Sequence, residues 1–179
     1  LKQRDWSAPK HHRAQLQNMT GLDVAAQRVV RLLAAEVSLA AGDAGQALST
    51  LEAKPWAKTD RAARLQLAQT RLAQQKPAQA KLVVNDLVLW VSQNPRDASA
   101  WMTLSQAYEQ QGDALRSIRA QAESRAVELD YAAAVDRFKA AQNLAYNLDR
   151  EGKLDRAGHV EASVIDARLR ALEQLRREE

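Results

Sequence analysis

Residues 94–113 read NPRDASAWMTLSQAYEQQGD, and this stretch indicates the fold more clearly than any other part of the chain. Trp101, Leu104 and Tyr108 are spaced by three and four residues, which places them on one face of a helix. Gly112 follows, and glycine is suited to end that helix because it tolerates a positive φ. The stretch therefore predicts a helix, a tight turn and the start of a second helix.

The same kind of interruption recurs along the chain, each time between two helical patterns: at Ala41-Gly42-Asp43, at Gln75-Lys76-Pro77 and at Gln111-Gly112-Asp113. The central residues of these turns are 34 and 36 positions apart. A period near 34 residues is that of the tetratricopeptide repeat (TPR), a helix–turn–helix unit. Residues 101–108 resemble the W-x2-L-G-x2-Y signature of its first helix, with Ser105 where glycine is usual.

The second helix of each unit needs a small residue for close approach and a large residue that fills the gap to the next unit. Suitable pairs are Ala47 with Leu51, Ala80 with Val84, and Ala134 with Phe138, the last continued by Ala141. We therefore expect an all-α fold, a TPR-like α-α superhelix (solenoid) of about three to four helix-pair repeats that ends in a C-terminal capping helix.

We predict a lead-in helix over residues 1–22, TPR-like repeats within 23–150 and a capping helix over 151–179. The repeats occupy about 23–55, 60–93, 98–128 and 114–147. The last two overlap because the turn at Leu129-Asp130 lies 17 residues beyond Gly112-Asp113, which is half a repeat. The helix between these two turns must then be the second helix of one unit and the first of the next. Leu129 stands where we expect a turn glycine.

Composition supports an all-helical chain and excludes several kinds of site. Good helix formers dominate, and aromatic residues make up only 4% of the chain. The chain has no cysteine, which excludes disulfides, zinc–thiolate sites and thiol nucleophiles. No apolar run reaches the roughly 18 residues that span a bilayer, so we expect no direct membrane insertion. The chain begins at Leu1, and we expect it to be a piece of a longer protein.

The charge pattern argues against a nucleic-acid partner. The formal net charge is only +4, and basic residues alternate with acidic ones throughout. The densest basic cluster comprises Arg168, Arg170, Arg176 and Arg177, interleaved with acidic residues. We interpret this cluster as a solvated helix face, and a basic docking patch is the alternative.

Residues suited to catalysis or metal binding are few. His11 and His12 are adjacent, so on a helix they diverge by about 100° and cannot share one metal ion. His159 stands alone, and we interpret it as an exposed polar residue. Neither a His-Glu-x-x-His motif nor a glycine-rich phosphate loop occurs. We therefore expect no catalytic residue, no metal site and no cofactor in this chain.

The four tryptophans are interpreted first as packing residues. Helical spacing around Trp90 and Trp101 places both in the core. Trp56 follows Pro55 in a loop between repeats, where it is either partly exposed or the hydrophobic plug of that loop.

A concave surface lined by the first helix of each repeat is the candidate partner-binding groove. Its predicted inward positions are Val29, Leu32, Glu36 and Leu39, then Ala62, Leu65, Gln69 and Leu72, and finally Ser99, Met102, Gln106 and Glu109. Such a surface could take an extended peptide or a helix. The alternative is that the first or last helix covers some of these positions.

The second half of the chain resembles a narrower family. Trp101-x-x-Leu104-x-x-Ala107, Ala122-Glu123-Ser124-x-Ala126, Ala134-Val135 and Asp166-Ala167-Arg168-Leu169-Arg170 occur in this order. Over roughly residues 60–175 the ordered set resembles the C-terminal TPR domain of periplasmic zinc metallopeptidases such as the beta-barrel assembly-enhancing protease, relatives of the heat-shock protease HtpX.

This resemblance implies a function that the residues alone do not show. The parent would carry a zinc protease domain, and the TPR array beside it would dock outer-membrane barrel proteins or their assembly machinery in the periplasm. Zinc is expected only in that protease domain, because no position in this chain matches a zinc ligand. The alternative is a stand-alone TPR scaffold or assembly adaptor with no protease domain. Catalysis by this segment itself ranks below both.

Overall fold

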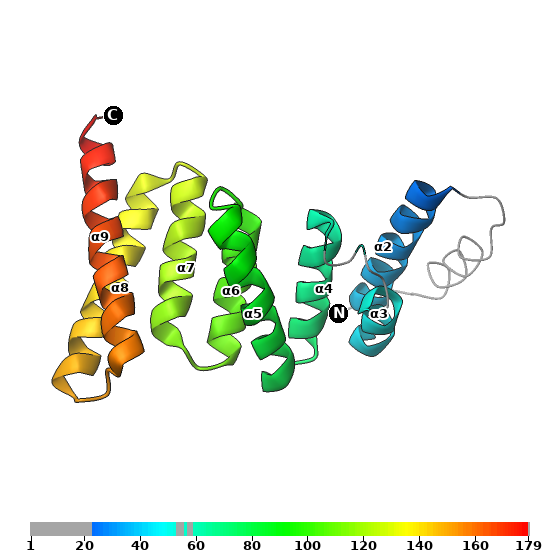
Figure 1. Ribbon diagram of the computed structural model, residues 1–179, viewed down its shortest axis with the longest axis horizontal. Helices are drawn as coiled ribbons and strands as arrows, with labels where there is room; N and C mark the ends of the chain where they lie inside the picture. The colour runs from blue at the N-terminus through cyan, green and yellow to red at the C-terminus, as the bar shows by residue number, and fades with distance from the viewer. Residues whose placement is uncertain (1–22, 53–55, 57–58, 179) are drawn as a thin grey trace, which may run out of the picture. The chain divides into compact units, whose positions relative to one another are not determined.

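The computed structural model describes residues 23–52, 56 and 59–178. The predicted lead-in helix over residues 1–22 lies outside this part, as do Trp6, His11 and His12. Every regular element among the described residues is a helix, which confirms the all-α class. In the labels of Figure 1 the helices are α2 (Val24–Ala40), α3 (Ala44–Glu52), α4 (Arg61–Ala73), α5 (Pro77–Gln93), α6 (Ala98–Gln110), α7 (Ala114–Val127), α8 (Tyr131–Arg150) and α9 (Arg156–Glu178).

Aspartate begins nearly every helix. In seven of the eight described helices the preceding residue is an aspartate whose Oδ1 accepts the backbone N–H three positions on, at 2.7 to 3.1 Å; these are Asp23, Asp43, Asp60, Asp97, Asp113, Asp130 and Asp155. Each cap contributes about 1 kcal/mol because it satisfies a donor that the first turn leaves unpaired. The exception is α5, which begins at Pro77, whose missing N–H is no loss in a first turn.

Five of the turns between helices contain one residue with a positive φ. Three are glycines, Gly42 (82°), Gly112 (75°) and Gly152 (65°), and the others are Gln75 (52°) and Leu129 (63°). All three turns predicted from the sequence lie between consecutive helices. The two turns that lack a glycine keep the same geometry, since Gln75 and Leu129 themselves take the left-handed conformation. That conformation costs a residue with a Cβ about 1–2 kcal/mol.

Contacts divide the chain into two units, one ending at Lys76 and one beginning at Pro77. In the first unit, α2 packs on both α3 and α4. Its core is built around Leu51 and Leu67, with Ala35, Ala47 and Ala63 between them. The small residues let the helices approach closely, and Gln66 Nε2 donates to Leu32 O across α4 and α2 at 2.8 Å. In the described part of this unit, three helices therefore pack closely on one another.

Trp56 joins the core of the first unit from the loop before α4. It packs against that core and remains partly exposed, so both features that the sequence offered as alternatives are present. The Arg28 guanidinium lies 6.0 Å from the centroid of its ring, at the outer limit of a cation–π contact. Arg28 also pairs with Asp60, the cap of α4, at 3.1 Å. The loop residue thus connects the start of α4 to α2.

In the second unit the helices α5 to α9 pack in chain order, each on the next (Figure 1). Serine hydroxyls take part in the contact between α6 and α7. The hydroxyls of Ser105 and Ser117 lie 3.2 Å apart, and Ser124 Oγ donates to Ala98 O at 3.0 Å. Larger side chains, with the fully buried Phe138 and Ile165 among them, form the core between α7, α8 and α9.

Trp90 and Trp101 both fix the loop between α5 and α6. Trp90 is half-buried and donates its ring N–H to Asp97 Oδ2 at 2.9 Å. Trp101 is buried and donates to the carbonyl oxygen of Pro95 at 2.9 Å. Each ring N–H therefore has a hydrogen-bond acceptor in the loop that precedes α6, in addition to the packing of the ring itself.

Each unit has a contact between two described helices that are not consecutive in the chain. In the first unit α2 contacts α4 across α3, whereas in the second unit α7 contacts α9 across α8. Since α7 also packs on α6, it has neighbours on three sides. That this helix belongs to two repeats at once remains a prediction.

Replacement of Leu129 by glycine is expected to stabilise the protein by about 0.5–1 kcal/mol, because glycine removes the strain of the left-handed turn but adds freedom to the unfolded chain. The free energy of unfolding from urea titrations followed by circular dichroism measures the change. The matched variant Gly112→Ala has no steric contact to relieve or create and should destabilise by about 1 kcal/mol. Loss of stability in Leu129→Gly would contradict this account.

Candidate partner-binding site

The groove positions predicted in the first unit are only partly accessible. Val29, Glu36, Ala62 and Gln69 are exposed, and Leu32 and Leu39 are partly buried against the core. Leu65 and Leu72 are buried, so both contribute to packing and offer no open surface to a partner. The reason is that α4 has buried residues on most of its circumference. The accessible remainder on α2 and α4 alternates between apolar and polar residues.

In the second unit the predicted positions form the polar side of α6. Ser99, Gln106 and Glu109 are exposed and Met102 is half-buried. These residues lie on α6 alone and line neither of the two hollows described below. They remain a prediction for partner contact, and a neighbouring surface is better formed for it.

That surface is a hollow of about 800 Å³, here called the α7–α9 hollow. Its lining comes from the loop before α6 and from α6 to α9, namely Pro95, Arg96, Trp101, Glu123, Ala126, Val127, Leu129, Tyr131, Arg168, Leu172 and Leu175. At its edge the side chains of Leu129 and Leu175 are 69% and 43% exposed. A predominantly apolar concavity with a few fixed polar groups is the usual form of a binding site.

One ion pair lies within this hollow. Glu123 of α7 is buried, and Arg168 of α9 donates to both of its carboxylate oxygens, from Nε at 2.8 Å and from Nη2 at 2.7 Å. The bidentate hydrogen bonds raise the pKa of Arg168 above its ordinary value. The two hydrogen bonds hold the Glu123 carboxylate in place among apolar side chains.

A second buried carboxylate fastens α9 to α7 nearer to the start of each helix. Glu161 of α9 accepts from Arg119 Nε, and Arg116 Nε lies 3.6 Å from its other oxygen. The Arg119 guanidinium also lies 5.5 Å from the centroid of the Trp101 ring, so it joins α6, α7 and α9. Burial raises the pKa of the neighbouring Tyr108 phenol, although the charges of Arg119 and Arg116 oppose that shift.

Only a weak signal for these residues is present in the sequence. Glu123 is the single acidic residue in the small-residue stretch Ala120–Ala126, and a buried position for it demands a cationic partner. Arg168 belonged to a cluster that we interpreted as solvated. Its pairing with Glu123 is set by the packing of α9 on α7, which no local pattern predicts.

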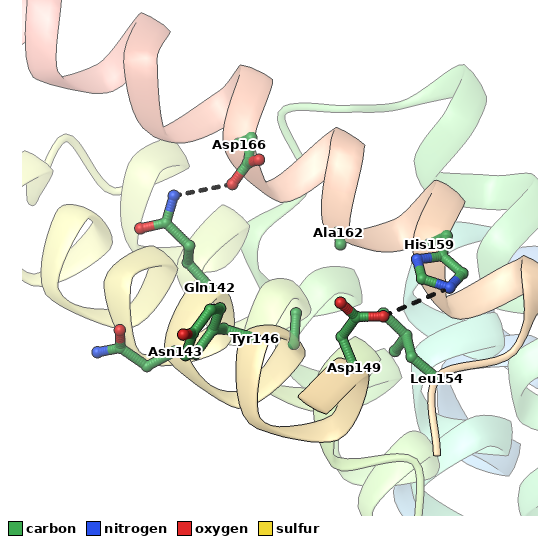
Figure 2. Close-up of a pocket in the computed structure, with 9 residues that line it drawn as sticks. Gln142, Asn143, Tyr146, Asp149, Leu154, His159, Ala162 and Asp166 are labelled. Atoms are coloured by element: carbon green, nitrogen blue, oxygen red, sulfur yellow. Dashed lines mark hydrogen bonds and ion pairs between the residues drawn. The ribbon is translucent and has the colours of Figure 1, made fainter. Parts of the chain in front are cut away.

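A smaller hollow of about 440 Å³ lies between α8 and α9, and Figure 2 shows its polar lining. Gln142 Nε2 donates to Asp166 Oδ1 at 2.9 Å. His159 Nε2 lies 3.7 Å from Asp149 Oδ1, which is the length of an ion pair and too long for a hydrogen bond. His159 is exposed, as the sequence indicated, and the nearby Ser163 hydroxyl donates to the His159 carbonyl at 3.0 Å. The Ser163 hydroxyl therefore donates to the backbone of His159 and not to its ring.

Two kinds of feature are absent from the described residues. No cluster of three or more histidine, cysteine, aspartate or glutamate side chains is arranged to hold a metal ion there. In the same part of the chain, no helix is both long enough and apolar enough to cross a bilayer.

Comparison of the sequence with protein-family models and with curated proteins found no match to either.

Breaking the ion pair in the α7–α9 hollow should destabilise the protein more than breaking an exposed one. Arg168→Met leaves the Glu123 carboxylate buried without its partner, and we expect a loss of about 2 kcal/mol, a value reduced because Arg168 is partly solvated. Adding Glu123→Leu should restore most of the loss. Urea unfolding of the single and double variants measures both effects.

The matched control is Lys139→Met, which removes the exposed Lys139–Glu173 pair (3.1 Å) between α8 and α9. Its expected cost is below about 0.5 kcal/mol. Equal losses in Lys139→Met and Arg168→Met would show that the buried pair has no special importance.

Stability should fall at alkaline pH in a manner that depends on Tyr108. The folded-state pKa of Tyr108 is raised, so above the ordinary value of 10.0 the unfolded chain loses its phenolic proton first. The free energy of unfolding then decreases as pH rises from 10 toward the folded-state pKa. In Tyr108→Phe this decrease should be smaller over the same range. Parallel curves for the two proteins, measured by chemical denaturation at pH 9 to 11.5, would contradict the prediction.

Proposed function

We propose that this chain is a protein-docking module built from TPR-type helix pairs. The α7–α9 hollow is the observation on which the proposal chiefly rests. It combines apolar side chains open to solvent with a floor held by hydrogen-bonded charges, and such a surface suits a segment of another polypeptide. The spacing of the left-handed turn residues also supports the proposal, since Gln75 lies 33 residues after Gly42 and Gly112 lies 37 after Gln75.

The fixed floor matters for binding because it lowers the cost of ordering the site. Among the lining residues, Trp101 of α6 contacts the Arg119 guanidinium of α7, and Glu123 of α7 is bound by Arg168 of α9. The conformational entropy lost on binding would therefore be mainly that of the partner segment, so less of the interaction free energy would be offset. The exposed Leu129 and Leu175 would then supply apolar contact at the edge.

We further propose, from the resemblance of residues 60–175 to the metallopeptidase family, that the module is the partner- or substrate-docking TPR domain of a periplasmic zinc metallopeptidase. In that protein it would present outer-membrane barrel proteins, or components of their assembly machinery, to a separate protease domain. The chain itself would bind no zinc and cleave no peptide bond. Outer-membrane protein quality control is the process in which we place it.

A stand-alone TPR scaffold or assembly adaptor is the alternative function. The two proposals share the docking surface and differ only in what precedes it. The coding sequence upstream of Leu1 separates them: a His-Glu-x-x-His motif about 150 or more residues earlier supports the metallopeptidase. A signal peptide close upstream, without such a motif, supports the scaffold.

Photo-crosslinking tests the docking surface directly. A photoreactive amino acid at Leu129 or Tyr131, in the protein produced in the periplasm of a Gram-negative bacterium, should form adducts with outer-membrane barrel proteins or their assembly components. We expect Leu175→Asp to reduce these adducts at least fivefold, because it places a charge in the apolar edge. Immunoblotting and mass spectrometry identify the adducts.

The matched control places the same reactive group at Ala140, which is exposed on α8 and lines neither hollow. Equal crosslinking from Ala140, or none from Leu129 and Tyr131, would rule out the hollow as the docking site.

A further inference from the structure

Helix α9 carries two apolar faces, and only one of them is buried. The buried face includes Ile165, Leu169 and Leu172, which pack in the core of the second unit. The other is here called the α9 stripe and comprises Ala157, Val160, Val164, Ala167, Ala171 and Leu175, all exposed. At about 100° per residue these six positions fall within about 80° of one another, and about 120° from the centre of the buried face.

The spacing of the α9 stripe is that of a helix–helix seam. From Val160 to Leu175 the steps are four, three, four and four residues, close to the 3.6 residues of one helical turn, so these positions stay on one face along the helix. Val160 is 61% exposed, and the central Ala167 and Ala171 would let a second helix approach closely. Leu175 also lines the α7–α9 hollow, so the stripe and the hollow form one continuous surface.

Positive charge borders this stripe on both sides. Arg156, Arg170 and Arg177 are exposed beyond one edge, and no described residue supplies any of them with a carboxylate partner. On the other edge lies Arg168, which remains partly solvated while it binds Glu123.

Two acidic residues of α9 are paired with bases of other helices: Glu161 with Arg119 and Glu173 with Lys139. The exposed Arg156, Arg170 and Arg177 therefore supply the charged groups along this edge of the stripe.

We propose that the α9 stripe, together with the edge of the α7–α9 hollow, binds an acidic amphipathic helix of a partner protein. This inference rests on the proposed docking function and specifies the chemistry of the guest. Apolar residues of the guest at i, i+3, i+4 and i+7 would pack along the stripe, and its flanking glutamates or aspartates would face the arginine rows. A second copy of this chain is a poor occupant, because pairing two α9 helices would set like-charged arginine rows side by side.

Fluorescence anisotropy with designed peptides tests the proposal on the full chain. The probe is a fluorescein-labelled 21-residue peptide with leucine at heptad positions a and d and glutamate at the flanking positions. We expect saturable binding that weakens at least fivefold between 50 and 300 mM salt. A peptide of the same composition in scrambled order, and one with lysine in place of glutamate, should each bind at least tenfold more weakly.

Substitutions on α9 then locate the binding site of the peptide. Val164→Asp should weaken binding at least tenfold, and Arg170→Glu combined with Arg177→Glu at least fivefold. Ala140→Asp, on an exposed face of α8, should leave the affinity unchanged. All these positions are exposed, so the thermal midpoint of each variant should stay within a few degrees of the parent and loss of folding is not confused with loss of binding.

The other outcomes each overturn the inference. If the acidic peptide binds no better than its scrambled form while crosslinking at Leu129 persists, the docking function stands and the α9 stripe is not its seam. If both experiments fail, the docking function fails as well. If phosphatidylglycerol vesicles bind in a manner abolished by Val164→Asp while the peptide does not bind, the stripe is a membrane-surface contact instead.

Discussion

Two buried carboxylates determine where α9 lies, and the surface available to a partner depends on that position. Glu161 of α9 is held by Arg119 of α7, and Glu123 of α7 is held by Arg168 of α9. Each helix therefore contributes one acid and one base, and both pairings must be made together. A shift of α9 by one turn would leave buried charges without partners, which is destabilising. The register of α9, and with it the α7–α9 hollow, follows from this constraint.

Local rules account for most of the secondary structure. Seven aspartates mark helix starts, and each precedes a stretch of good helix formers. Turn chemistry located the interruptions near Gly42 and Gly112 without any knowledge of packing. It was less informative at Leu129, where the left-handed conformation is imposed by the helices on either side and not by the residue. The positions of helices and turns could thus be predicted from the sequence, whereas the strained backbone conformation of Leu129 could not.

The candidate site was harder to predict, because it depends on contacts between residues about 45 positions apart. Regular repeat positions assigned Leu65 and Leu72 to a groove, yet both are buried. Counting charges along α9 suggested a face on which acidic residues balance the arginines. The count does not show that Glu161 and Glu173 are paired with Arg119 and Lys139. Surface charge is a property of the folded array, in which some acids are used internally and the bases beside them are left over.

Helix α7 packs against three other helices of the second unit. A helix with neighbours on three sides has little surface on which substitutions are tolerated, which is consistent with its buried alanines and serines. Because α7 joins α6 to both α8 and α9, disturbance of its packing would affect the whole second unit. Its small side chains make the interfaces close and leave little room for adjustment.

At Leu129, in the turn between α7 and α8, the stability of the fold and the proposed binding of a partner favour different residues. A residue with a Cβ is tolerated there at an energetic penalty, and its side chain stands open to water at the mouth of a concavity. Replacement of this leucine by glycine during evolution would increase the stability of the fold, and it would remove the apolar contact proposed for the leucine side chain. Among descendants of an ancestral gene, those that still need a guest should keep a bulky side chain in this corner, and those retained only as architecture should lose it. The identity of one corner residue would then record which lineages still use the surface.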